Sequence, residues 1–341
     1  MTTESTSVLG TFLELKEQLK QNILGQQLLV DRLLLALLAD GHMLVEGAPG
    51  LAKTRAVKML GEAIEGNFHR IQFTPDLLPS DVTGTEIYRP QEASFVFQRG
   101  PVFHNLVLAD EINRAPAKVQ SALLEAMGER QVTVGRETYQ LPELFLVMAT
   151  QNPIEQEGTY PLPEAQLDRF LMQVNIDYPA VEDELKIVQL VREENKKMLQ
   201  GHHQENNPNS ASSSDQDRQI YLINQQQVMQ GRSEVLDLYM SPEVERYLVE
   251  LVQATRYPER YNQELSEWIE WGGSPRASLA LDRCSKAHAW LQDRDFVTPE
   301  DLQQIAPDVL RHRILLTYGA ESKGLNTDEV LQRILELVPV P

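Results

Sequence analysis

The chain has 341 residues, of which 42% are hydrophobic and 24% are charged, and its formal net charge is −19. This length allows a sizeable buried core and favours about two domains, and the acidity argues against a protein that grips nucleic acid over a broad surface. A single cysteine, Cys284, excludes an internal disulfide and a Cys-based zinc site. No apolar run is long enough to span a bilayer and no secretory signal is visible, so we expect a cytoplasmic protein.

The first elements are two helices. Residues 9–21 have amphipathic spacing, and residues 26–39 are apolar nearly all round, which indicates a well-buried helix. The turn between them contains Ile23 and Gly25 and is followed by Gln26. These three residues could wall an adenine beside a phosphate site, or they could simply begin a helix.

A phosphate-binding loop follows the apolar run 42–46 and precedes a segment with helical spacing, 55–65. A Gly-rich turn between strand and helix directs several backbone N–H groups into one concavity, where the positive end of the helix dipole also favours phosphate. Lys53 is then expected to reach the β- and γ-phosphates, and Thr54 Oγ to bind Mg²⁺. The general pattern has Gly where this chain has Ala52, which is tolerated if φ stays negative. The expected nucleotide-binding residues are Gly47, Ala48, Pro49, Gly50, Leu51, Ala52, Lys53 and Thr54.

A second strand and a hairpin come next. Alternating apolar and polar residues predict a strand at 68–73, and Pro75, Pro79 and Gly84 predict a loop with at most one helical turn. Two β-prone pieces around a turn at 90–93 predict a hairpin within 86–98.

Two buried strands carry candidate catalytic residues at their ends. Residues 106–111 form an apolar run that ends in Asp110 and Glu111, and in open α/β sheets ligands bind beyond the carboxyl ends of strands. Asp110 is expected to hold Mg²⁺ and Glu111 to orient or deprotonate the attacking water. A helix at 117–127, a hairpin at 131–140 and a strand at 144–150 follow. Asn152 then lies where an amide can bond a γ-phosphate or the water, although it could instead cap the loop before proline.

An arginine and a domain boundary close the first half. Arg169 precedes the apolar strand 170–176, and at a domain edge it could stabilise charge on a neighbouring subunit's γ-phosphate, or pair with Asp168 or Glu164. Pro179 marks a predicted boundary between a domain at 1–178 and a helical domain at 179–341. Helices are predicted at 181–198, 235–236, 242–256, 276–293, 299–311 and 327–337.

Two features of the second half stand out. The polar tract around 199–218 has too little apolar surface to order itself, so we expect a mobile insertion. Arg276 lies in the first turn of a helix capped by Ser274, where a cation opposes the helix dipole. An external anion or a tertiary ion pair would account for this placement.

These motifs together resemble those of the AAA+ ATPases, and several longer strings resemble the MoxR family within them. The strings are Gly41 to Gly47 with Pro49 to Thr54, Gln72 to Asp81, Asp110 to Pro116, Ala149 to Pro153, Leu167 to Phe170, and Ser274 to Ala277. The likeness runs from about Gln18 to the C-terminus, without the polar insertion, and Ala52 is similar to what MoxR proteins often carry.

The resemblance implies a five-stranded parallel AAA+ core with a helical lid, ATP lying between them, and a hexameric ring. The hairpin at 86–98 would be the helix-2 insert, and the hairpin at 131–140 would precede the sensor strand. Asn152 becomes sensor 1, Arg169 the trans-acting finger, with Arg114 as a rival, and Arg276 sensor 2. Family members act as chaperone-like remodelers, often beside a von Willebrand factor A domain protein.

The expected activity is therefore Mg²⁺-dependent ATP hydrolysis completed by an arginine of the adjacent subunit. Two alternatives remain open. A nucleic-acid motor would be favoured by a basic hairpin, but residues 86–98 hold one Arg and two Glu. A non-hydrolysing nucleotide-gated scaffold is disfavoured by Glu111 and Asn152.

Overall fold

A five-stranded parallel sheet forms the centre of the protein. The computed structural model describes residues 7–48, 50–51, 53–153, 158–204 and 222–341. The strand order is β2-β5-β8-β1-β9, and every neighbouring pair is parallel. The prediction of a five-stranded parallel core is confirmed. The strands are β1 (Met43–Glu46), β2 (Phe68–Gln72), β5 (Leu106–Asp110), β8 (Leu146–Gln151) and β9 (Met172–Asn175).

The sheet is buried on both faces because alternate side chains enter two different hydrophobic clusters. Leu106 and Leu108 pack on one face, whereas Val107 and Ala109 pack on the other. The first face is covered by helices from both halves of the chain, and the second by α5. The helices of the first half are α1 (Val8–Asn22), α2 (Gln27–Leu38), α3 (Lys53–Ala63), α4 (Pro79–Thr83), α5 (Ala117–Glu129) and α6 (Glu164–Leu167).

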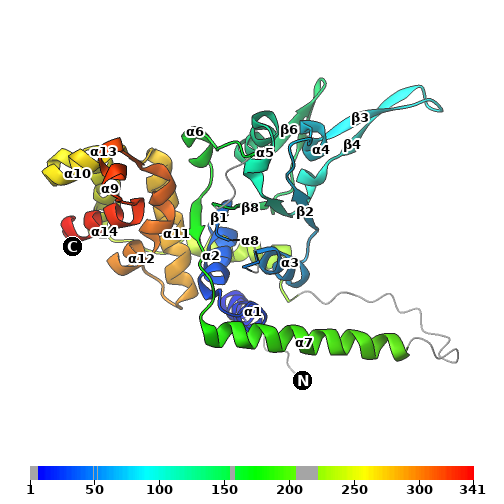
Figure 1. Cartoon of the computed structure of the whole chain (residues 1–341), viewed down its shortest axis with the longest axis horizontal. Coiled ribbons are helices and arrows are strands. Elements are labelled where there is room, and N and C mark those ends of the chain that lie inside the picture. Colours follow the sequence, from blue (N-terminus) through cyan, green and yellow to red (C-terminus); the bar gives the residue numbers. More distant parts are fainter. Residues whose placement is uncertain (1–6, 49, 52, 154–157, 205–221) are drawn as a thin grey trace.

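Both predicted hairpins are confirmed. The first consists of β3 (Gly84–Arg89) and β4 (Ser94–Arg99), and the second of β6 (Gln131–Val134) and β7 (Glu137–Gln140). The two hairpins lie side by side at one end of the molecule (Figure 1), where the rings of Phe97 and Tyr139 stack at 4.1 Å.

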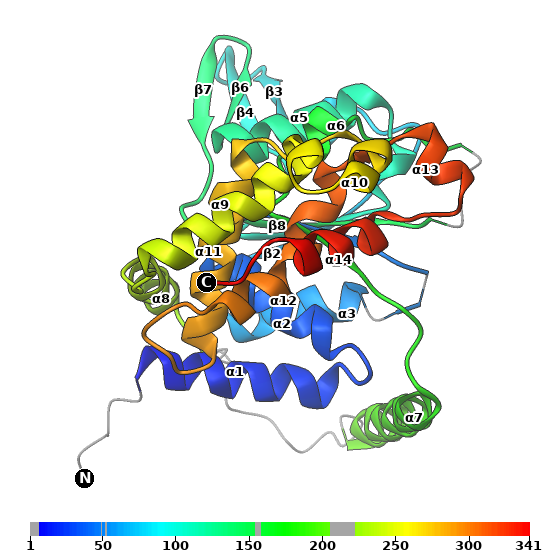
Figure 2. The same ribbon diagram turned by 90° about the vertical axis from the view of Figure 1, so that its left-hand side faces the viewer.

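The second half is helical, but the sequence analysis missed the helices at Gln263–Trp268 and Tyr318–Ser322 and a two-stranded ribbon. A short antiparallel ribbon joins β10 (Ile269–Trp271) to β11 (Leu315–Leu316). The helix α7 (Val181–Gln204) projects from the body of the protein (Figures 1 and 2) and extends past its predicted end at Met198. The remainder of the predicted insertion, 205–218, lies outside the described residues. The other helices are α8 (Gln225–Leu236), α9 (Pro242–Arg256), α10 (Gln263–Trp268), α11 (Pro275–Leu291), α12 (Pro299–Leu310), α13 (Tyr318–Ser322) and α14 (Thr327–Leu337).

Core and lid share one continuous hydrophobic cluster and a buried ion pair. The cluster contains residues of α2 and the sheet together with residues of α8, α9, α11 and α12. Arg32 of α2 donates from Nε to Asp308 Oδ2 of α12 at 2.5 Å, and both side chains are buried. The helix α8 also packs against α1 and α2, so the chain returns to the core after α7. The division at residue 179 remains a prediction.

Candidate functional site

The candidate nucleotide site is a cavity of about 400 Å³ at the carboxyl edge of the sheet. It brings together the phosphate loop, the acid pair and Asn152, as their positions after β1, β5 and β8 led us to expect. The residues that line it are Gly50, Leu51, Lys53, Thr54, Arg55, Arg70, Asp110, Glu111 and Asn152. Two loop residues of the predicted set, Pro49 and Ala52, lie outside the described residues.

The start of the phosphate loop requires glycine. A Cβ on Gly47 would lie 2.5 Å from Ile176 Cγ1 and 2.6 Å from the carbonyl oxygen of the same residue. Gly50 has a φ of +84°, a conformation that L side chains rarely adopt. Ala48 is buried beside them. Without a side chain, Gly47 can lie against Ile176, the residue that follows β9.

Lys53 is nearly buried, and its ammonium group already points along the loop. Its Nζ donates a hydrogen bond to the Gly47 carbonyl oxygen at 2.7 Å. Burial lowers the pKa of Lys53, while the nearby carboxylates of Asp110, Glu111 and Glu46 act in the opposite direction. The side chain is thus a cation held among acids, which a phosphate could take as a partner.

The acid pair is held by a network of polar side chains. Thr150 Oγ1 donates to Asp110 Oδ1 at 2.6 Å and accepts from the Glu111 N–H at 2.9 Å. The other carboxylate oxygen of Asp110 accepts from Arg70 Nη2 at 2.6 Å. Gln72 Nε2 donates to Glu111 Oε2 at 2.8 Å. The backbone of Glu111 is left-handed, with φ 57° and ψ 51°, which is uncommon for a residue other than glycine and suggests local strain.

The sequence analysis missed Arg70, Gln72, Thr150 and Arg55. Arg70 and Gln72 are two residues apart on β2, so both side chains lie on the same face of that strand. The register pairs Gln72 with Asp110 of the adjacent strand β5. The sequence shows that Arg70 and Gln72 share one face of the strand, but only the pairing of β2 with β5 shows that this face meets the acid pair.

A smaller cavity of about 70 Å³ adjoins the phosphate loop and contains two of the three residues expected to wall the adenine. Ile23 and Gln26 line it, with Gly50 and Leu51 from the loop and Ile187, Leu190 and Val191 from α7. Gly25 has a φ of +73° and packs against Pro179. Gln26 also precedes the first residue of α2, but its side chain donates to the Asp177 carbonyl at 2.8 Å rather than capping the helix.

The predicted arginines lie elsewhere. Arg169 and Arg276 do not line the nucleotide cavity of their own chain; they line a cavity of about 390 Å³ that includes Gly41 and His42, at the amino ends of β1 and β9. The strand β1 between the two edges has four residues, which is roughly 13 Å of extended chain. Arg114, the rival of Arg169, lies beside its own Glu111, with Nε 3.3 Å from Oε2.

This second cavity carries a surplus of positive charge. Two aspartates line it, Asp40 and Asp168, and they pair with Arg130 and Arg313. Burial and the neighbouring Arg130 lower the pKa of His42 to about 4, so its imidazole is neutral near pH 7. The arginines in excess are Arg169, Arg276 and Arg283.

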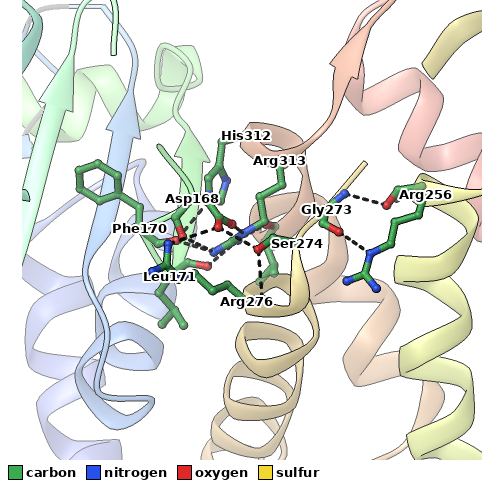
Figure 3. A network of polar contacts seen from close by, with 11 residues as sticks. Asp168, Phe170, Leu171, Arg256, Gly273, Ser274, Arg276, His312 and Arg313 are labelled. Atoms are coloured by element: carbon green, nitrogen blue, oxygen red, sulfur yellow. Dashed lines mark hydrogen bonds and ion pairs between the residues drawn. The ribbon is translucent and has the colours of Figure 1, made fainter. Parts of the chain in front are cut away.

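Arg169 does not pair with Asp168 as its sequence neighbourhood allowed, whereas Arg276 does lie beside that carboxylate. Arg169 Nη1 donates to the Leu124 carbonyl oxygen at 2.6 Å, and Asp168 pairs with Arg313 instead. Arg276 Nη1 lies 3.5 Å from Asp168 Oδ2, which is the tertiary ion pair that its position on α11 allowed (Figure 3). The Arg276 side chain is 58% exposed, so an anion could still reach it.

Comparison with known proteins agrees with this architecture. Residues 42–172 match the "ATPase family associated with various cellular activities (AAA)", and residues 264–334 match the "AAA lid domain". Chaperone MoxR1 of Mycobacterium tuberculosis is 43% identical over 95% of this chain and 81% of its own length. The uncharacterized protein YeaC of Bacillus subtilis is 41% identical over 95% of this chain and 93% of its own.

A solved structure shares the whole fold. The crystal structure of an ATPase candidate from Cytophaga hutchinsonii superposes with a TM-score of 0.85 and 43% identity, covering 98% of this chain and 96% of the other. Among the residues that the structure describes, no helix is long and apolar enough to cross a membrane. The chain belongs to the MoxR family of AAA+ ATPases.

Proposed function

We propose that this protein hydrolyses ATP with Mg²⁺ at the subunit interfaces of a homo-oligomeric ring and uses the energy to remodel a client protein. The observation that carries the proposal is the separation of the site into two parts. The phosphate loop and acids lie at the carboxyl edge of the sheet, whereas the surplus arginines lie at the amino edge. Head-to-tail association would bring the two parts together, and such heterologous contacts form a ring when the rotation from one subunit to the next closes on itself.

The residues of the first cavity fit a magnesium nucleotide. Mg²⁺ prefers oxygen ligands, and the Thr54 hydroxyl and the Asp110 carboxylate line the cavity together. Bound there, the ion would neutralise charge on the β- and γ-phosphates. Lys53 would exchange its hydrogen bond to the Gly47 carbonyl for a stronger, charge-assisted one to phosphate. Ile23, Gly25 and Gln26 would flank the base.

Glu111 and Asn152 are assigned to the attacking water and the γ-phosphate. The Gln72 hydrogen bond and the Thr150 contact to its backbone hold Glu111 at the end of β5, facing the same cavity as Lys53. A carboxylate in this position can orient the water and accept its proton. Asn152 is buried at the end of the next strand, where its amide can donate to a phosphate oxygen.

Arg169 and Arg276 are assigned to the nucleotide of the neighbouring subunit. Arg169 suits the trans role better than Arg114 does, because Arg114 lies beside the acid of its own chain. An arginine supplied in trans contributes about 10³–10⁵ in rate in nucleotide hydrolases. Turnover would then depend on assembly.

A protein client fits the exposed hairpin better than nucleic acid does. At the hairpin of β3 and β4, Tyr88 is 50% exposed and Phe95 is 67% exposed, and their rings contact each other. Nucleic-acid binding would call for a basic surface, but Glu86 and Glu92 offset the arginines of this hairpin. The name of the relative Chaperone MoxR1 agrees with client remodelling. A cytoplasmic location and a von Willebrand factor A domain partner are part of the same proposal.

The test measures phosphate release against protein concentration with ATP and Mg²⁺, together with light scattering for mass. We expect activity per subunit to rise as a ring-sized species appears. Lys53→Ala should abolish ATP binding, whereas Lys58→Ala is a matched control, because Lys58 is an exposed residue of the same helix and pairs with Glu62. Activity that is independent of concentration in a monomer would overturn the shared site. No activity at any concentration would favour the scaffold alternative.

A further inference from the structure

Beside the amino-edge cavity, one carboxylate, Asp168, bonds both to the core–lid connection at Arg313 and to the start of α11. Its Oδ1 accepts from Arg313 Nε at 2.8 Å, and its Oδ2 accepts from Ser274 Oγ at 2.8 Å. Asp168 directly precedes Arg169 in the core, and Ser274 is the N-cap of α11, which carries Arg276. One side chain therefore joins the segments that carry the two arginines (Figure 3).

The core side of this junction is held by a buried arginine. Besides pairing with Asp168, Arg313 donates from Nη2 to the Phe170 carbonyl at 2.6 Å and from Nη1 to the Leu171 carbonyl at 3.2 Å. Its side chain is only 2% exposed. Arg169 thus lies between Asp168 and Phe170, each of which is bonded to the same guanidinium.

The lid side of this junction is also held by several hydrogen bonds. Ser274 Oγ accepts from the Arg276 N–H at 3.1 Å while donating to Asp168. Before it, the Gly273 N–H donates to Thr255 Oγ1 at 3.0 Å and the Gly273 carbonyl accepts from Arg256 Nε at 2.5 Å. The turn before α11 is therefore fixed to α9 on one side and to the core on the other (Figure 3). The negative charge of Asp168 at the start of α11 also suits the dipole of that helix.

We propose that Asp168 is a positioning residue, which through Arg313 and Ser274 holds Arg169 of the core and Arg276 of the lid on one wall of the amino-edge cavity. The inference rests on the proposed function, because it assumes that this cavity receives the triphosphate of the neighbouring subunit. Correct placement matters because misplacing a catalytic group by about 1 Å can cost on the order of 10²-fold in rate. Movement of the lid would be transmitted to Arg276 and Arg169 together.

Ser274→Ala is the first test, because it removes the hydrogen bond to Asp168 without exposing the buried Arg313. The matched control is Ser241→Ala, which removes a serine N-cap from α9 in the same half of the protein but has no bond to the core. We expect Ser274→Ala to lower kcat about tenfold with KM for ATP, melting temperature and ring mass close to those of the control. A kcat equal to that of Ser241→Ala would overturn the proposal.

Asp168→Asn gives the second readout, which a merely structural defect would not produce. Asp168→Asn keeps an intact phosphate loop and acid pair, and Glu111→Gln keeps an intact amino-edge cavity. Mixing the two should therefore restore phosphate release at interfaces where the first variant supplies the acid pair and the second supplies the arginines. Random mixing in equal amounts makes about a quarter of the interfaces competent, because each interface is heterologous. No recovery from two assembled variants would overturn the proposal; if Asp168→Asn does not assemble, the Ser274→Ala comparison decides.

Arg169→Ala separates failure of this inference from failure of the proposed function. If Arg169→Ala loses activity and recovers on mixing with Glu111→Gln, the shared site stands, and an unaffected Ser274→Ala refutes only the positioning role. If Arg169→Ala keeps wild-type kcat, Arg169 is not the trans-acting arginine, and both that assignment and the positioning role of Asp168 fail.

Discussion

Replacing Glu111 with glutamine should separate ATP binding from ATP hydrolysis. The substitution keeps the size of the side chain and exchanges one carboxylate oxygen for an amide. The left-handed backbone at this position is supported by the hydrogen bond from the Glu111 N–H to Thr150 Oγ1 at 2.9 Å, which does not involve the side chain. The backbone should therefore stay in place.

The cost in stability should be small. The side-chain oxygen that accepts from Gln72 Nε2 at 2.8 Å remains available in the amide. The ion pair with Arg114 at 3.3 Å is lost, but the Arg114 side chain is 39% exposed, and pairs of this kind contribute about 0–1 kcal/mol. We expect the free energy of unfolding to change by no more than about 1 kcal/mol.

The effect on turnover should be far larger. An amide cannot accept the proton of the attacking water, and a positioned acid or base contributes about 10²–10⁴ in rate. This range corresponds to about 3–5 kcal/mol of activation free energy. The affinity for ATP should hardly change, because Lys53 and the phosphate loop are untouched.

The assay pairs phosphate release with binding of a fluorescent ATP analogue, under conditions where the wild type is assembled. Glu17→Gln is the matched control, since Glu17 is an exposed residue of α1 and is not among the residues that line either cavity. Near wild-type turnover in Glu111→Gln would refute the role assigned to this carboxylate. Loss of ATP binding would show that it acts in binding rather than in catalysis.

Three further perturbations follow from the packing. Gly47→Ala should weaken ATP binding by about tenfold or more in titration calorimetry, because its Cβ would lie 2.5 Å from Ile176 Cγ1 and displace the loop; unchanged affinity would contradict this. The pKa of His42 is lowered from 6.5 to about 4, so the unfolded state binds a proton before the folded state does as the pH falls. Between pH 7 and pH 5 this histidine should lower the free energy of unfolding, measured with urea, by about 2 kcal/mol, and His42→Gln should remove that part of its pH dependence. Asp308→Asn takes the charge partner from the buried Arg32 and should destabilise the fold by about 3–5 kcal/mol in chemical denaturation; a change below 1 kcal/mol would be inconsistent with a buried pair.

The sequence alone determined the parts that depend on local spacing. The apolar runs before Gly47 and Asp110 predicted buried strands, and the β-prone pieces within 86–98 and 131–140 predicted hairpins, because these patterns need only neighbouring residues. The phosphate loop, the acid pair and Asn152 were placed at one edge of the sheet by the rule that parallel strands end together. The structure brings Lys53, Thr54, Asp110, Glu111 and Asn152 around one cavity.

Only the tertiary structure decided which distant residues meet. Arg70 and Gln72 reach the acid pair because β2 lies next to β5, and strand order is not written in either strand. The ribbon of β10 and β11 joins residues more than forty positions apart, and each of these two strands is too short to give a periodic signal. Arg169 and Arg276 were both singled out from the sequence, but their common cavity at the amino edge follows from the docking of α11 and Arg313 on Asp168. Such long-range contacts are set by packing and charge in three dimensions, which one-dimensional spacing does not encode.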